Sequence, residues 1–142
     1  MSFVLSGCQN GTERKITEKK VQAALSATNV VLCPAAGGEI MLSTAQATTV
    51  KQLVRKFTDP SRVMIKKDIP GFEYAGFVMG GEYFSWYGSY VYFRDHRKRI
   101  HIIRDPIITK MEQSYVNSLG LPPFKPLPPE VWRKILSELG PE

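Results

Sequence analysis

Four segments between residues 62 and 104 constrain the fold more than any other part of the chain. They read RVMIKKDI, FEYAGFVM, EYFSWYGSYVYF and RKRIHIIR. Their aromatic and β-branched residues are typical of strands, and Pro-Gly at 70–71, Gly-Gly at 80–81 and Asp-His at 95–96 are turn signals of hairpin length. The pattern predicts an antiparallel meander of about four strands, with a bulge or bend at Gly88 in the third.

Four other segments carry the pattern of helices that pack on such a sheet. In the segment 45–57, apolar residues recur at helical spacing on one face, namely Ala47, Val50, Leu53, Val54 and Phe57. The segment 106–119 follows Asp105 as N-cap, begins with Pro106 and precedes Gly120 as a stop signal. Together with helices at about 13–27 and 129–139, the pattern predicts a single α+β domain.

A shorter strand pair and the division of the chain complete the predicted architecture. VVLCP reads as a buried strand that ends at Pro34, and EIMLS, after the turn AAGG, reads as its antiparallel partner. The length of 142 residues corresponds to one domain. We expect an α+β body at 1–120 and, at 121–142, a proline-rich linker with a C-terminal helix that packs on the body or extends from it.

The chain is basic, and its charge is unevenly placed. The formal net charge is +6 and the sequence pI is about 9.4. Residues 61–105 hold eight Lys and Arg against five Asp and Glu, whereas residues 106–142 hold four of each. A positive surface favours nucleic acid, an anionic membrane surface or an acidic protein as a partner. We therefore expect the cationic surface on the body and not on the C-terminal segment.

Aromatic and basic residues are interleaved in the second half of the predicted meander. Strand alternation places Tyr90, Tyr92 and Arg94 on one face, with Val91 and Phe93 on the other. Single-stranded nucleic acid is commonly held by aromatic rings that stack on bases, beside cations that contact phosphates. In the alternative interpretation, the rings pack against helices, and the basic residues of the turn at 94–99 are merely solvated. The candidate site for an anionic partner comprises Tyr90, Tyr92, Arg94, Arg97, Lys98, Arg99 and Arg104.

The segment LPPFKPLPPEVWRKILSELG at 121–140 allows three interpretations. In the first, Pro128 and Pro129 begin a helix that packs on the body and ends at Gly140. In the second, KPLPPEV resembles a ligand of Src-homology-3 domains, in which a basic residue, here Lys125, accompanies a polyproline turn. In the third, LPPEVWRKILSELG resembles the opening of an F-box, which implies docking on the adaptor subunit of a ubiquitin ligase.

Both resemblances imply that the segment contacts a partner protein. They exclude each other, because polyproline II and helix cannot occupy residues 127–129 at once. The residues that such a partner would contact are Lys125, Leu127, Pro128, Val131, Trp132, Ile135 and Leu139. In the first interpretation the apolar stripe of this helix faces the body instead.

No motif in the sequence indicates catalysis. His96 and His101 are five residues apart on or beside a strand, so their side chains leave opposite faces. Cys8 and Cys33 lie far away in the sequence, so we expect no zinc site. The glycine pairs lack the spacing of a phosphate-binding loop. We expect no enzyme activity, no cofactor and no metal.

These observations favour a non-catalytic, small basic binding or assembly protein, such as a structural component of viral type. Its contact surfaces would be the cationic aromatic sheet and the apolar C-terminal helix, and its partner another protein or a second copy of the chain. One alternative is an adaptor that presents residues 121–140, and another is a single-stranded nucleic-acid-binding protein. Two cysteines without a disulfide framework indicate the cytoplasm or nucleus. No apolar run approaches the ~20 residues that span a bilayer.

Overall fold

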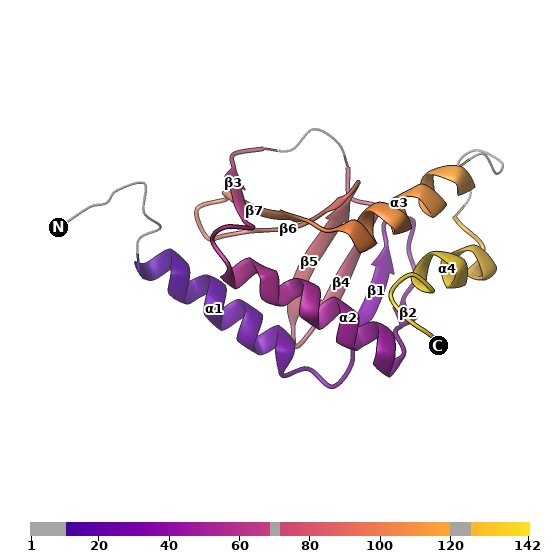
Figure 1. The fold of residues 1–142 in the computed structure, drawn as a ribbon, viewed down its shortest axis with the longest axis horizontal. Coiled ribbons are helices and arrows are strands. Elements are labelled where there is room, and N and C mark those ends of the chain that lie inside the picture. The colour runs from indigo at the N-terminus through magenta and orange to yellow at the C-terminus, as the bar shows by residue number, and fades with distance from the viewer. Residues whose placement is uncertain (1–10, 69–71, 120–125) are drawn as a thin grey trace.

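One antiparallel sheet organises the computed structural model, which describes residues 11–68, 72–119 and 126–142 (Figure 1). Within these residues seven strands follow the order β2-β1-β4-β5-β6-β7-β3. They are β1 (Val31–Pro34), β2 (Ile40–Met41), β3 (Met64–Lys66), β4 (Ala75–Met79), β5 (Glu82–Tyr87), β6 (Tyr90–Arg94) and β7 (Ile100–Arg104). The helices are α1 (Gly11–Leu25), α2 (Thr44–Arg55) with the 3-10 turn η1 (Lys56–Thr58), α3 (Pro106–Ser118) and α4 (Pro129–Leu136). The predicted single α+β domain is confirmed.

The sheet corrects the predicted four-stranded meander. Strands β4, β5, β6 and β7 pair in sequence order, but the third predicted strand is in fact two strands, β5 and β6. Gly88 adopts a φ of +57°, a conformation that favours glycine, and the chain reverses there. The indole N–H of Trp86 donates to the Gly88 carbonyl at 2.8 Å and supports this turn. Gly88 is therefore a turn residue and not a bulge.

The first predicted strand of the meander also has a different neighbour. β3 lies at the sheet edge and pairs with β7, where Met64 is opposite Ile102, although β4 is the next strand in the sequence. The opposite side of the sheet is extended by the predicted pair β1 and β2, in which Val31 is opposite Met41. β1 also pairs with β4. Strand composition predicted the strands but not these neighbours, because pairing depends on contacts distant in the sequence.

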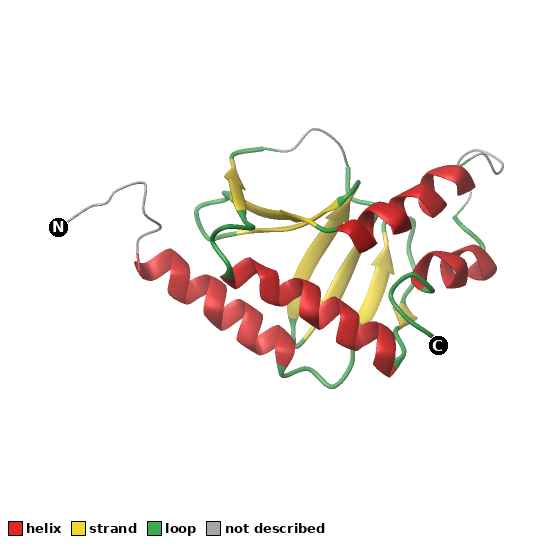
Figure 2. Cartoon of the chain, in the orientation of Figure 1, coloured by secondary structure: helices red, strands yellow, loops and turns green. Residues whose placement is uncertain are grey.

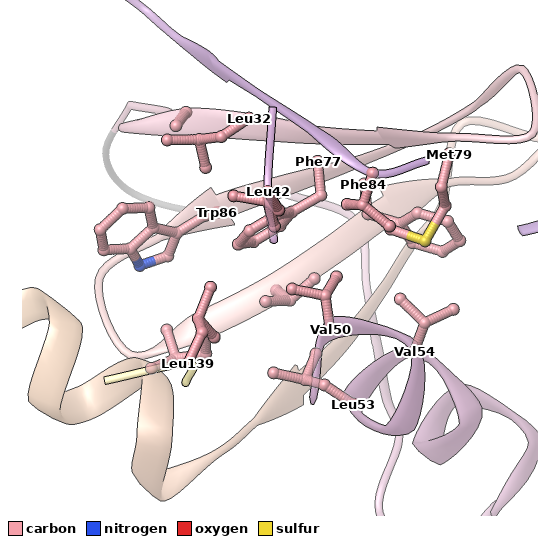
Figure 3. Packing of buried hydrophobic residues seen from close by; sticks show 14 of the residues in the cluster. Leu32, Leu42, Val50, Leu53, Val54, Phe77, Met79, Phe84, Trp86 and Leu139 are labelled. Carbon is pink, nitrogen blue, oxygen red and sulfur yellow. The ribbon is translucent and has the colours of Figure 1, made fainter. Parts of the chain in front are cut away.

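All four helices lie on one face of the sheet (Figures 1 and 2). Their buried side chains form a single core cluster with those of the strands, and the predicted face of α2 is buried throughout. Figure 3 shows Val50, Leu53 and Val54 of α2 packed beneath the strand side chains. The strand residues labelled in that view are Leu32, Phe77, Met79, Phe84 and Trp86. The helices therefore cover one face of the sheet, and among the described residues no helix covers the other face.

Local signals set where the helices begin. Ser43 caps α2 because its Oγ accepts from the Gln46 N–H at 3.2 Å, while Gln46 Oε1 accepts from the Ser43 N–H at 3.0 Å. Asp105 caps α3 as predicted, since its Oδ1 accepts from the Ile107 N–H at 2.9 Å. Gly120, the predicted stop of this helix, lies outside the described residues.

The C-terminal helix packs on the body, as the first interpretation of this segment predicts. The side chains of Trp132, Ile135, Leu136 and Leu139 are buried in the core cluster. The amide of Gln46 donates to the carbonyls of Leu136 at 3.3 Å and Gly140 at 3.2 Å. The Thr49 hydroxyl donates to the Leu139 carbonyl at 2.6 Å. These bonds tie the end of α4 to α2.

Candidate functional site

The sheet face that points away from the helices carries most of the residues predicted to bind an anionic partner. Val91 and Phe93 point into the core, and Tyr90 and Tyr92 lie on the opposite side, in agreement with strand alternation. Residues directly opposite on neighbouring strands share a face. By this register the outer face comprises Val31, Cys33, Met41, Met64, Lys66, Gly76, Val78, Tyr83, Ser85, Tyr87, Tyr90, Tyr92, Arg94, Ile100, Ile102 and Arg104.

Three outer-face residues form a row at one end of the sheet. Tyr87 of β5 lies opposite Tyr90 of β6, and Tyr90 lies opposite Arg104 of β7. The two tyrosine rings are nearly parallel, with 22° between their planes and 6.4 Å between their centroids. Both tyrosines are half-buried, and Arg104 is exposed. The row therefore places a cation beside two packed, half-buried rings.

Tyr92 lies on the predicted face of the sheet but is almost inaccessible there. Its side chain is 9% exposed and packs with Ile100 and Ile102, and Tyr87 and Tyr90 pack against this small cluster. Tyr92 lies opposite Ile102, so a branched apolar side chain from β7 covers part of it. Its ring supports the neighbouring tyrosines and is not itself a contact surface.

Tyr83 is an exposed ring that the sequence did not single out as a binding residue. It is 43% exposed and reaches across to Gly76, where a methyl group would lie 2.1 Å from its Cζ. Its hydroxyl donates to Glu73 Oε1 at 2.7 Å. Burial, together with this hydrogen bond and the charge of Glu73, raises the pKa of Tyr83, so the hydroxyl remains a donor. A glycine inside a strand signals close approach, and Gly76 could have indicated this contact.

The cationic turn between β6 and β7 is held together by Asp95. Its Oδ1 accepts from the backbone N–H groups of Arg97 at 2.8 Å and Arg99 at 3.0 Å. The Asp95 N–H donates to the Arg99 carbonyl at 2.9 Å, and Lys98 adopts a φ of +63°. Arg94, Arg97 and Lys98 are exposed, and Arg99 is half-buried. The structure thus gathers these four predicted cations at one turn.

His101 supports this turn from the core side. It is buried, its Nε2 lies 2.9 Å from Asp95 Oδ2, and its ring stacks on Phe93 with centroids 4.6 Å apart. Burial favours a higher pKa of Asp95, but the hydrogen bonds from His101 and from the N–H groups of Arg99 and Arg97 outweigh it and lower that pKa. Asp95 therefore remains a carboxylate near neutral pH.

A hollow of about 560 Å³ lies beside Arg104 at the start of α3. Its lining includes Arg104, Pro106, Thr109 and Lys110. The neighbouring carboxylate of Asp105 is paired with Lys56 and caps the helix, so its negative charge is compensated. The hollow therefore presents two exposed cations. The sequence predicted Arg104 as a site residue but missed Lys110, which the turn from β7 into α3 brings close.

The residues predicted to contact a protein through the C-terminal segment are placed differently. Trp132, Ile135 and Leu139 are buried in the core cluster and are not accessible to a partner in this fold. Leu127 and Val131 are half-buried against the same cluster, and Pro128 is exposed. Lys125 lies outside the described residues. An apolar stripe has the same sequence pattern whether it faces its own body or another protein, which explains the difference.

Another cavity, of about 240 Å³, lies between the β1–β2 turn and the helices α3 and α4. Its lining includes Tyr74, Tyr115, Leu119, Leu127 and Trp132. The rings of Tyr74 and Tyr115 stack with centroids 4.2 Å apart, and burial raises the pKa of both. Among its described lining residues, Glu39 alone is charged. This cavity is therefore better suited to an apolar group than to an anion.

Possible metal ligands and a thiol occur among residues 11–68, 72–119 and 126–142. No group of three or more His, Cys, Asp and Glu side chains in these ranges could hold a metal ion. Burial, together with the charges of Glu39 and Glu73, raises the pKa of the Cys33 thiol and so lowers its thiolate fraction near neutral pH. Cys8 lies outside these ranges. No helix in them has the length and apolar character needed to cross a membrane.

Comparison of the chain with protein-family models, with curated proteins and with solved structures finds no match. The geometry of the outer face and of the cationic turn is therefore the basis for assigning a function.

Proposed function

We propose that the protein is a non-catalytic binding or assembly protein that holds an anionic partner on its outer face and cationic turn. One observation carries this proposal: the helices pack on one face of the sheet, and the other face presents half-exposed tyrosines beside exposed arginines. Antiparallel sheets commonly leave one face in water. A solvated sheet face usually carries polar residues, so aromatic rings next to cations are a more specific indication of a binding surface.

The positions of the arginines support this proposal. Arg94 and Arg104 lie at opposite ends of the paired strands β6 and β7, opposite Ile100 and Tyr90 respectively. At about 3.3 Å per residue, the four-residue separation along the strands places them roughly 13 Å apart. Neither arginine forms an ion pair with a described residue. Both charges are therefore available to an extended anionic partner.

The alternative of an adaptor that presents its C-terminal segment has less support. Its apolar anchors Trp132, Ile135 and Leu139 contribute to the core, and exposing them would require part of the domain to open. Partners whose charge fits the outer face are a polyanion and an acidic protein, whereas a second copy of this chain carries the same net positive charge. The fold alone does not distinguish between these partners, and the side chains on the outer face have to be considered.

Retention on immobilised heparin, a polyanion without bases, tests the proposal. The variant Arg94→Ser/Arg104→Ser should elute at lower salt than the wild type. The matched control is Arg133→Ser/Lys134→Ser, which removes the same charge from the exposed side of α4. All four side chains are exposed, so both variants should keep their melting temperature, since surface changes are usually worth about ±0.5 kcal/mol. Equal loss of retention in the two variants would mean that net charge, and not this surface, governs binding.

A further inference from the structure

The outer face offers flat aromatic surfaces in addition to charge. Tyr87 and Tyr90 form a nearly parallel pair beside Arg104, and Tyr83 lies near the opposite end of β5 and is more exposed than either. A simple polyanion or an acidic side chain makes use of the cations but has no need of the rings. Planar heterocycles stack on tyrosine, and this stacking tolerates any base sequence. The combination therefore favours a ligand with both phosphates and bases.

Tyr83 is held in place before any ligand arrives. Its ring covers the backbone at Gly76, and its hydroxyl is fixed by Glu73 at 2.7 Å. A ring that already occupies one orientation loses little conformational freedom when it binds, which raises affinity. Gly76 and Glu73 thus act as positioning residues for this ring.

The cations lie where a chain that stacks on these rings would carry its phosphates. Arg104 is opposite Tyr90 and also lines the hollow that contains Lys110 and the hydroxyl-bearing Thr109. Arg94 lies on the same strand as Tyr90, at the other end of β6, next to the cationic turn. Cations therefore flank the Tyr87 and Tyr90 pair on the hollow side and continue toward residues 94–99.

We infer that the outer face binds single-stranded nucleic acid, with bases stacked on Tyr83 and on the pair formed by Tyr87 and Tyr90. The phosphates contact Arg104 and Lys110 at the hollow and Arg94 near the turn. This inference rests on the proposed function, because it names the partner of the same surface. A duplex is excluded as the main ligand, since its base faces are stacked inside the helix and cannot reach the tyrosines.

The decisive experiment uses the wild-type protein and fluorescence anisotropy. The probes are labelled oligonucleotides of about 12 residues, because single-stranded sites commonly span roughly 4–16 nucleotides per domain. DNA and RNA of one sequence are compared with an abasic chain of equal charge and with the duplex. Both single strands should bind about a hundredfold more tightly than the abasic chain, since each of the two stacking sites contributes about tenfold. Tighter binding of RNA than of DNA would add contacts to the 2′-hydroxyl.

Two classes of variant separate the rings from the cations. Tyr90→Leu and Tyr83→Leu remove a stacking surface and should weaken binding of the normal strand about tenfold while leaving the abasic chain unchanged. Arg104→Ser and Lys110→Ser should weaken binding of every probe and each reduce the slope of log affinity against log salt by about one. Lys134→Ser, on the exposed side of α4, is the control and should change neither.

Equal affinity for the normal and abasic chains would overturn the inference without any variant, so failure of a variant to fold does not affect the test. If heparin retention still depended on Arg94 and Arg104, the proposed function would stand with a partner other than nucleic acid. Binding of polyglutamate as tight as that of the oligonucleotides would likewise overturn the inference and identify an acidic protein. Loss of both the base effect and the arginine-dependent retention would overturn inference and proposed function together.

Discussion

The ring of Tyr83 occupies the space that a side chain at position 76 would need. A methyl group on Gly76 would lie 2.1 Å from Cζ and 2.1 Å from the hydroxyl oxygen of Tyr83, well inside contact distance. The missing side chain on β4 and the ring on β5 are therefore complementary. This complementarity keeps an exposed aromatic ring ordered on a solvent-facing surface.

Gly76→Ala should consequently destabilise the protein by about 1 kcal/mol, the lower end of the range for overpacking, because the tip of an exposed ring can move. The cost should disappear in the Tyr83→Ala background, where the space is empty. Urea unfolding of the two single variants and the double variant gives the coupling between the positions. Additive effects would show that Gly76 is required for a reason unrelated to Tyr83.

Asp95→Asn should lower the free energy of unfolding by about 1–3 kcal/mol. The neutral amide has only one acceptor oxygen, so it cannot accept both from the N–H groups of the turn and from His101 as the carboxylate does. Arg97→Ser, which alters an exposed side chain of the same turn, should have little effect. Thermal unfolding of both variants near neutral pH provides the comparison. A similar loss in both would contradict the central role of Asp95.

The contribution of the Asp95 carboxylate should also appear in the pH dependence of the free energy of unfolding. The folded pKa of Asp95 is lowered, so its carboxylate contributes stability that is fully present above the unfolded pKa of about 4. This stability is lost as the pH falls through the folded pKa, since the unfolded state then binds the proton more readily. Urea unfolding between about pH 6 and pH 3 should therefore show a shallower decline for Asp95→Asn than for the wild type. Parallel curves would mean that Asp95 titrates alike in both states.

Leu136→Ala should cost about 2–5 kcal/mol, because Leu136 is buried in the core cluster and its truncation leaves a cavity. Lys134→Ala, two positions earlier on the exposed side of α4, is the matched control. Differential scanning calorimetry should show a large fall in melting temperature for the first variant alone. An unchanged melting temperature for Leu136→Ala would indicate that α4 is detached from the body in solution.

Features set by neighbouring residues could be predicted from the sequence, and features set by distant contacts could not. The buried face of α2 and the Asp105 cap of α3 depend on helical periodicity and on short-range hydrogen bonds. The pairing of β3 with β7 depends on the order of the other strands, which places β7 next to the edge of the sheet. No local pattern contains that information.

The candidate site divides in the same way. Alternation correctly separated Tyr90 and Tyr92 from Val91, yet it did not reveal that Ile100 and Ile102 from β7 would bury Tyr92. Lys110 was overlooked because its position beside Arg104 depends on the direction in which α3 leaves β7, and the sequence does not show that direction. Trp132 was predicted to contact a partner but is buried in the core, since an apolar helix face serves either purpose.

The hydrogen bonds from α2 to residues 136–140 can form only after the C-terminal segment has reached the body. Gln46 and Thr49 bind carbonyls of residues 90 positions farther along the chain. Contacts with such sequence separation form late and slow folding. During vectorial synthesis, α2 and the inner side chains of β4 and β5 emerge long before residues 132–139 can cover them. We therefore expect the growing chain to expose an apolar groove for a time, and such surfaces favour aggregation.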